Sequence, residues 1–270
     1  MAFIQENVIH IHLNLNTTYT LIHFSDVHAI HISIKDSSKE YQKALEHETS
    51  WLRVRKEFAD YFNELCTEEH MIASCQCLKN LLYYTNQIQP DLLLMSGDII
   101  DYNSSSNIQF LTKEVKKLTC PYIITYGNHE NPDIFKKITY NQDDFMVQNL
   151  KELKVIGIDN SKKVFTSNQI QKLKKELEEN KPILLCMHIP LMTSLNQNEM
   201  KKYDTYYIID HQNCDKVTKE FIDIVISHPL IKHIFCGHTH GQGLSEFAKN
   251  KNQYCASSGL IGYVNKIILS

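Results

Sequence analysis

The chain contains 270 residues, of which 43% are hydrophobic, and its formal net charge is −3 at pH 7. This length suits a single α/β domain that spans residues 1–270 and buries a substantial core. The sequence holds no run near the ~20 apolar residues that cross a bilayer, and its charge balance lacks the basic excess of nucleic-acid-binding proteins. We therefore expect neither a membrane span nor a nucleic-acid partner.

The N-terminal segment has the alternating pattern of a strand rather than that of a signal peptide. Residues Val8 to Leu15 alternate Val, Ile and Leu with His and Asn, and no basic region precedes them. A second strand is expected over Thr18 to Ser25. The eight cysteines form no regular framework, which predicts reduced thiols in a cytoplasmic protein.

A long, charged segment follows, and its pattern predicts helices. Residues 36–66 are amphipathic, and we expect a helical insertion there. Trp51, Arg53 and Arg55 lie in this insertion, which could form a lid; for the two arginines, a solvated helix face is the simpler expectation. A second helix is expected just before the strand at Asp91.

From there the chain alternates between strands and helices, which is typical of an α/β fold. Helices are expected near Ile108–Leu118, from a cap at Thr166 or Ser167 through Glu179, and over Asp215–Ser227, with strands at Tyr122, after Pro182 and before Gly237. The C-terminal segment predicts a strand, a glycine turn and a last strand. Strand–helix alternation followed by late strand pairs indicates two sheets.

Five short motifs stand at the ends of five strand-like apolar runs. They are Asp26-Val27-His28, Gly97-Asp98-Ile99-Ile100-Asp101, Gly127-Asn128-His129-Glu130, His188 and Gly237-His238-Thr239-His240. If these strands lie parallel, their carboxyl ends deliver Asp, Asn and His side chains to one edge of a sheet, where open α/β folds hold ligands. Mixed oxygen and imidazole donors suit first-row dications. The sequence therefore predicts a metal site.

The five motifs, in this order, resemble those of the calcineurin-like metallophosphoesterases, from about Leu21 to the C-terminus. The resemblance implies an α/β fold, a four-layer αββα sandwich of two mixed β-sheets flanked by helices. It also implies two divalent metal ions, with Mn²⁺ expected and Fe, Zn, Co or Ni as alternatives. Two cations roughly 3.5–4 Å apart can clamp a phosphate and lower the pKa of a bridging water.

The family pattern assigns the motif residues to two ions that share one carboxylate. By resemblance, the first ion would be held by Asp26, His28, Asp98 and His240, and the second by Asp98, Asn128, His188 and His238. His129 matches the position that contacts the phosphate or protonates the leaving oxygen. Glu130 is expected to orient that imidazole, although many relatives have Asp there, and Asp101 is expected to support a ligand.

Substrate contacts are expected from residues outside the five motifs. His31 follows the first motif by three residues and could reach the substrate. The segment Leu191 to Cys214 leaves directly from a ligand strand, and its Tyr203, Tyr206 and Tyr207 could bind an aromatic or anionic group. The alternative is that these tyrosines only pack the segment.

Sequence details around two motifs favour the phosphodiesterase branch of the family. Asp101 is followed by Tyr102-Asn103 instead of the Arg-Gly of protein phosphatases, and it replaces the tyrosine ligand of purple acid phosphatases. His188-Ile189-Pro190 resembles the motif of small bacterial phosphodiesterases. We expect hydrolysis of a small phosphoester, a cyclic-nucleotide or nucleotide-type diester above all, by metal-activated hydroxide. The alternatives are a phosphomonoesterase of the same family and a protein-interaction module that kept the fold but lost catalysis.

Overall fold

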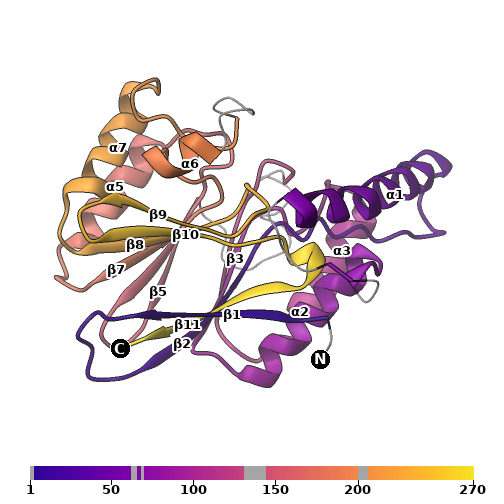
Figure 1. The fold of residues 1–270 in the computed structure, drawn as a ribbon, viewed down its shortest axis with the longest axis horizontal. Helices are drawn as coiled ribbons and strands as arrows, with labels where there is room; N and C mark the ends of the chain where they lie inside the picture. Colours follow the sequence, from indigo (N-terminus) through magenta and orange to yellow (C-terminus); the bar gives the residue numbers. More distant parts are fainter. Residues whose placement is uncertain (1–2, 62–65, 68–69, 131–143, 200–205) are drawn as a thin grey trace.

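The computed structural model describes residues 3–61, 66–67, 70–130, 144–199 and 206–270. Within them, two β-sheets pack face to face, and helices cover the outer face of each sheet (Figure 1). This is the four-layer αββα arrangement, so the fold class predicted from the sequence is confirmed.

The first sheet has the strand order β1-β11-β2-β3-β4. These strands are β1 (Gln5–Ile11), β11 (Tyr263–Leu269), β2 (Tyr19–Phe24), β3 (Leu92–Ser96) and β4 (Tyr122–Thr125). β2, β3 and β4 are parallel neighbours, whereas β11 runs antiparallel to β2. The carboxyl ends of the three parallel strands therefore meet at one edge of the sheet.

The second sheet has the order β5-β6-β7-β8-β10-β9. Its strands are β5 (Phe145–Asn149), β6 (Lys154–Ile158), β7 (Ile183–Cys186), β8 (Ile231–Cys236), β10 (Lys251–Cys255) and β9 (Gly243–Ala248). β6, β7, β8 and β10 run parallel, and the antiparallel β5 and β9 close the edges. Neither edge strand was expected, because FMVQN and GLSEFA are short and carry weak alternation.

Three apolar cores separate the four layers. The helices are α1 (Ser38–Tyr61), α2 (Ser74–Ile88), α3 (Ser105–Val115), α5 (Ser167–Leu177), α6 (Ser194–Glu199) and α7 (Lys216–Ser227). Leu78 of α2 and Leu111 of α3 pack on the first sheet, and Phe221 of α7 packs on the second. Leu94 and Leu184 both belong to the core between the sheets. In the described part of the chain, no helix is both long and apolar enough to cross a bilayer.

The start of α5 follows from a local sequence signal. The side chain of Thr166 accepts a hydrogen bond from the backbone N–H of Gln169, and the Gln169 side chain accepts one from the N–H of Thr166. This reciprocal pair satisfies two N–H groups that would otherwise lack a partner at the helix start. The cap expected at Thr166 or Ser167 is confirmed at Thr166.

Helix α1 lies in the segment where we expected a helical insertion, and one of its arginines is not solvated. Arg53 is exposed, as expected, but Arg55 is only 1% exposed. The Arg55 guanidinium lies 3.3 Å from Glu48 Oε1 and donates to the carbonyls of His70 and Ile72. The expectation for Arg55 was wrong because the inner face of α1 packs on the chain before α2, where these acceptors offset the cost of burying the charge.

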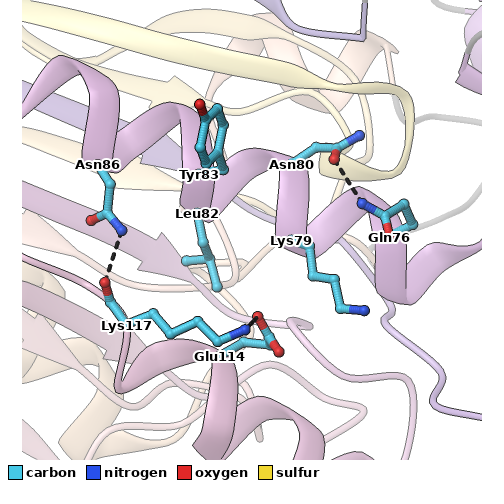
Figure 2. Close-up of a pocket in the computed structure, with 8 residues that line it drawn as sticks. All are labelled: Gln76, Lys79, Asn80, Leu82, Tyr83, Asn86, Glu114 and Lys117. Carbon is cyan, nitrogen blue, oxygen red and sulfur yellow. Dashed lines mark hydrogen bonds and ion pairs between the residues drawn. The ribbon is translucent and has the colours of Figure 1, made fainter.

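Helices α2 and α3 also frame a surface pocket on the outer side of the first sheet (Figure 2). It is lined by Gln76, Lys79, Asn80, Leu82, Tyr83, Asn86, Glu114 and Lys117. The Asn86 side chain donates to the Lys117 carbonyl at 2.8 Å, and Lys117 Nζ lies 2.5 Å from Glu114 Oε2. This pocket is built on helices and is separate from the strand ends that carry the five motifs.

Candidate metal centre

The seven predicted ligands converge on the edge where the parallel strands end. β2 leads to Asp26 and His28, β3 to Asp98, β4 to Asn128, β7 to His188, and β8 to His238 and His240. Backbone bonds join these loops: the N–H of His238 donates to the Asp26 carboxylate, and the N–H of His28 donates to the Asp98 carbonyl, both at 2.9 Å. Loops from both sheets therefore meet in one site.

The backbone of these loops is strained at the ligand positions. Five of the seven ligands have positive φ: Asp26 at 53°, His28 at 46°, Asp98 at 51°, His238 at 67° and His240 at 59°. A residue other than glycine held in this region costs on the order of 1–3 kcal/mol, and such residues cluster at functional sites. This backbone conformation therefore occurs at ligand positions in the loops that follow β2, β3 and β8.

Two glycines allow the loops to approach one another closely. A Cβ at Gly127 would lie 2.0 Å from Asp98 Oδ1, and one at Gly237 would lie 1.9 Å from Ser25 Oγ. Both distances are shorter than any real contact, so another residue at either position would push the loops apart. These glycines are therefore required by the packing around the Asp98 and Asp26 carboxylates.

One group of potential ligands joins Asp26, His28 and His240, all buried, with one ligand atom of each within 4.8 Å of the others. His28 Nε2 lies 3.1 Å from His240 Nε2, and His240 Nε2 lies 3.4 Å from Asp26 Oδ1. Two imidazole nitrogens and a carboxylate oxygen thus face one small volume. We call these three residues the covered half of the centre.

A second group joins Asp98, His188 and His238 in the same way. His188 Nε2 lies 3.3 Å from Asp98 Oδ2 and 3.1 Å from Asn128 Oδ1. His188 Nδ1 lies 2.8 Å from the carbonyl oxygen of Ser96. Because a carbonyl can only accept, Nδ1 carries the proton and Nε2 offers its lone pair to a metal. We call Asn128, His188 and His238 the open half.

Asp98 lies between the two halves. Its Oδ2 is 3.3 Å from His188 Nε2 and 3.8 Å from His28 Nε2. Its Oδ1 accepts a hydrogen bond from the backbone N–H of His129 at 2.9 Å. A third possible ligand group, His28, Asp98 and His129, links the halves through this carboxylate.

Burial and the charges of neighbouring side chains shift the pKa values of these residues. Burial raises the pKa of Asp98, but His188 and His28 lower it more, so it lies below its usual value. Burial lowers the pKa of His188, yet Asp98 raises it to about 9. Burial, followed by His188, lowers the pKa of His238 to about 3. The centre is thus built from strongly coupled charges.

The donor set fits divalent cations. It combines two carboxylates, one amide and four imidazoles, and the carboxylates and imidazoles are at most 6% exposed. Buried carboxylates are costly without a positive partner, and burial raises the pKa of Asp26 in this structure. Mixed oxygen and imidazole donors suit first-row dications.

Asp101 connects the centre to helix α1, which the sequence did not reveal. Its Oδ1 lies 3.1 Å from His129 Nδ1 and 3.3 Å from His28 Nδ1. His47 Nδ1 lies 2.6 Å from its Oδ2, and the indole N–H of Trp51 donates to Oδ1 at 2.8 Å. The signal available in the sequence was the i, i+4 spacing of His47 and Trp51, which places them on one helix face.

Glu130 does not orient His129; that position is taken by Asp101. Both oxygens of Glu130 accept backbone N–H bonds, from Gly127 at 2.8 Å, Asp98 at 3.1 Å, Ile99 at 2.7 Å and Ile100 at 3.1 Å. Burial, with the Asp98 charge, raises the pKa of Glu130 to about 7. Glu130 does not pair with His129 because it accepts from four backbone N–H groups of the two loops that follow β3 and β4, and these groups need an acceptor.

His129 is held by Asp101 through two contacts. Its Nδ1 donates to the Asp101 carbonyl at 2.9 Å and lies 3.1 Å from the carboxylate. Burial lowers the pKa of His129, but the Asp101 hydrogen bond and the nearby Asp98 raise it to about 9. The side chain remains 35% exposed, so this imidazole reaches the surface of the centre.

Of the residues expected to contact substrate, two described tyrosines lie beside the candidate ligands and His31 does not. The His31 ring stacks on Phe110 of α3 at 5.1 Å and 11°, so the structure does not bring it to the ligands. The rings of Tyr206 and Tyr207 lie 5.6 Å and 5.2 Å from the His238 ring, at the open half. Tyr203 lies outside the described residues.

Fold and site together define an α/β protein with a candidate metal centre at its strand ends. The family model described as calcineurin-like phosphoesterase matches residues 19–242. The chain belongs to this family, so the resemblance noted in the sequence is confirmed.

Known relatives and solved structures agree with this assignment. A probable cyclic nucleotide phosphodiesterase of Synechococcus sp. is 28% identical over 60% of this chain and 64% of its own length. A probable glycerophosphodiester phosphodiesterase of Arcobacter nitrofigilis is 24% identical over 61% of this chain and 63% of its own length. The matches therefore span just under two thirds of these relatives. The crystal structure of a dimetal phosphatase from Danio rerio shares the fold, with a TM-score of 0.58, 10% identity, and coverage of 90% of this chain and 88% of that one.

Proposed function

We propose that this chain is a metal-dependent hydrolase of phosphodiesters that uses two divalent cations bridged by Asp98. The observation that carries the proposal is the position of this carboxylate. One oxygen, Oδ2, lies within 3.8 Å of an imidazole nitrogen from each half of the centre, His28 Nε2 and His188 Nε2. A carboxylate shared between two ions is what a two-metal phosphate clamp requires.

Each group of side chains would have a distinct task. Bound cations would neutralise the phosphate and lower the pKa of a water molecule that attacks phosphorus. The first cation would be held by Asp26, His28, His240 and Asp98, and the second by Asp98, Asn128, His188 and His238. His129 engages Asp101 through Nδ1, so its Nε2 is the nitrogen available to contact the phosphate or to protonate the leaving oxygen.

The substrate class is proposed from the relatives and from the open half of the centre. Two relatives are named as probable phosphodiesterases, of cyclic nucleotides and of glycerophosphodiesters. Tyr206 and Tyr207 stand beside His238, and a tyrosine ring offers a flat apolar face with a polar tip. A small diester that carries a ring, such as a cyclic nucleotide or another nucleotide-type diester, suits this wall.

The native metal and the compartment are part of the same proposal. Mn²⁺ is compatible with a site of mixed carboxylate, amide and imidazole ligands. All eight cysteines carry free thiols, and a reducing compartment such as the cytoplasm preserves free thiols.

The test compares an aryl phosphodiester with the matching aryl phosphomonoester, using the chain loaded with Mn²⁺. We expect two ions per chain by elemental analysis and faster turnover of the diester. Asp98→Asn should remove the activity, whereas Asp91→Asn, the same change at the opposite end of β3, should keep it. Faster turnover of the monoester would replace the proposal with a phosphomonoesterase. Two bound ions without turnover of either ester would indicate a non-catalytic module.

A further inference from the structure

Two side chains of α1 contact the metal centre from outside the five strand-end motifs. His47 and Trp51 are four residues apart, so they share one face of this helix. The indole N–H of Trp51 donates to Asp101 Oδ1 at 2.8 Å, and His47 Nδ1 lies 2.6 Å from Asp101 Oδ2. Each oxygen of this buried carboxylate is therefore held by one donor from α1.

Asp101 passes this constraint to two imidazoles of the centre. Its Oδ1 lies 3.3 Å from Nδ1 of His28 and 3.1 Å from Nδ1 of His129. A carboxylate that lies so close to one nitrogen of an imidazole restricts the ring orientation and the direction of the other nitrogen. For His129 the contact includes a hydrogen bond to the Asp101 carbonyl; for His28 it is a close approach without hydrogen-bond geometry. For His28 that other nitrogen, Nε2, faces His240 at 3.1 Å; for His129 it is the nitrogen left for substrate.

The Trp51 ring also covers one side of the centre. It stacks on the His28 ring at 4.0 Å and 23°, and on the His240 ring at 5.6 Å and 26°. An imidazole under such a ring cannot swing out of its plane toward α1. The stacking and the hydrogen bond to Asp101 thus restrict the same ligand, His28, in two directions.

Other residues of α1 also hold this helix on the rest of the chain. The helix is also anchored by Glu48, which accepts from the backbone N–H of Ser74 at 3.0 Å, and by Arg55, which donates to the carbonyls of His70 and Ile72. An apolar side chain at position 51 could fill the same space without an N–H. The polar atoms of His47 and Trp51 are thus placed for Asp101 itself.

We propose that Trp51 and His47 are positioning residues that act through Asp101 on His28 and His129. This inference rests on the proposed function for its effect on turnover, but not for its effect on metal retention. Helix α1 is then part of the metal centre through these two side chains. This helix supplies the support that strand backbone supplies to His188 through the Ser96 carbonyl.

The first test measures metal retention by the full, Mn²⁺-loaded chain during dialysis against graded chelator. Trp51→Phe keeps a ring but removes the N–H, and His47→Leu removes the donor. Each should weaken retention of one of the two ions by about 10–100-fold, the range for lost partners of metal ligands. His47→Asn, whose amide places an N–H donor where Nδ1 lies, should recover most of the retention. The matched control is Arg53→Leu, at an exposed position of the same helix.

The second test uses the only tryptophan of the chain as a reporter. Trp51 stacks on His28, so Mn²⁺ or Co²⁺ bound at the centre should quench its fluorescence. Removal of the metal with a chelator should therefore raise the Trp51 fluorescence of the wild type. Fluorescence that does not change when metal leaves would contradict the placement of Trp51 beside the centre.

The third test separates positioning from stability by varying the leaving group of aryl phosphodiesters. Trp51→Phe and His47→Leu should lose more rate with poor leaving groups than with good ones, the same dependence that we expect for His129→Ala. Their thermal unfolding should be close to that of Arg53→Leu. The inference would be overturned if both variants retained metal as the wild type does and showed only a uniform loss of rate or a lower melting temperature. Helix α1 would then have a structural role alone. If the wild type binds metal but hydrolyses no ester, the proposed function fails while the retention test still decides this inference.

Discussion

The two halves of the metal centre are supported by different parts of the fold. In the open half, the Nδ1 of His188 is held by the carbonyl of Ser96, so the support is the backbone of β3. In the covered half, His28 has Asp101 at its Nδ1 and Trp51 stacked on its ring, so the support comes from side chains, including one of α1. A hydrogen bond from the sheet backbone remains when a single side chain is substituted. A contact from a side chain is lost when that side chain is replaced.

The two halves also differ in the side chains that lie over them, which affects how substrate can reach the centre. Helix α1 lies over His28 and His240 through the Trp51 ring, while the open half is bordered by Tyr206 and Tyr207. We therefore expect substrate to enter from the tyrosine side. The following predictions test this division, from the largest expected effect to the smallest.

Asp98 belongs to both halves, so its loss should abolish them together. Asp98→Asn should reduce kcat by at least about 10⁴-fold, the scale for an essential member of a catalytic unit, and should lower the content of both metals. Circular dichroism should remain that of the wild type. A variant that loses only one ion would show that the carboxylate serves a single half.

His129 stands at the surface of the centre and is proposed to act on substrate. His129→Ala should lower kcat by about 10²–10⁴-fold, as expected for a lost general acid, with both metals retained. The loss should be smaller for good leaving groups, because these need little protonation. The control is His211→Ala, at an imidazole that pairs with Asp223 on the surface. Equal losses for good and poor leaving groups would mean that His129 stabilises charge and is not the acid.

His23 lies in β2, beneath the covered half, and should make folding stability depend on pH. Burial lowers its pKa from 6.5 to about 3. His23 therefore binds a proton near pH 6.5 in the unfolded chain but only near pH 3 in the folded chain. The free energy of unfolding consequently falls as the pH falls through this window.

At pH 5 the cost from this one residue is about 2 kcal/mol. Urea unfolding of the metal-free chain at pH 7 and pH 5 should show a smaller loss for His23→Gln than for the wild type. His23 donates to or accepts from Ser96 and Asn265 in the folded state, and Gln keeps a polar group there. An identical pH loss in both proteins would contradict the buried, neutral imidazole.

The tyrosines of the open half should affect affinity more than rate. Tyr206→Ala and Tyr207→Ala should each raise KM for a cyclic nucleotide by about threefold to tenfold, the effect of losing one ring contact, with kcat and metal content nearly unchanged. The control is Tyr83→Ala, at an exposed tyrosine in the α2–α3 pocket (Figure 2). Unchanged KM across a panel of diesters in both variants would make this wall structural only.

What the sequence predicts well is local. An apolar run followed by a polar motif defines a strand and its end, so the residues of both halves could be assigned to strand ends before their positions were known. The Thr166 cap follows from a pattern of four residues. The edge strands β5 and β9 were not predicted because short, half-exposed strands show little alternation of apolar and polar residues.

What the sequence could not predict depends on where separate segments pack. The burial of Arg55 and the contacts of Trp51 exist only because α1 lies against the chain before α2 and over the covered half. The role of Glu130 depends on four N–H groups of loops that meet only in the fold. Spacing can place His47 and Trp51 on one helix face, but it does not identify the residues that this face contacts.

The most direct test of the central claim is a crystal structure of the chain grown with excess Mn²⁺, with the metals located by anomalous scattering. The account predicts two peaks roughly 3.5–4 Å apart, with Asp98 in contact with both, His28 and His240 at one, and Asn128, His188 and His238 at the other. A single peak, or two peaks of which only one touches Asp98, would contradict the proposed two-metal phosphodiesterase.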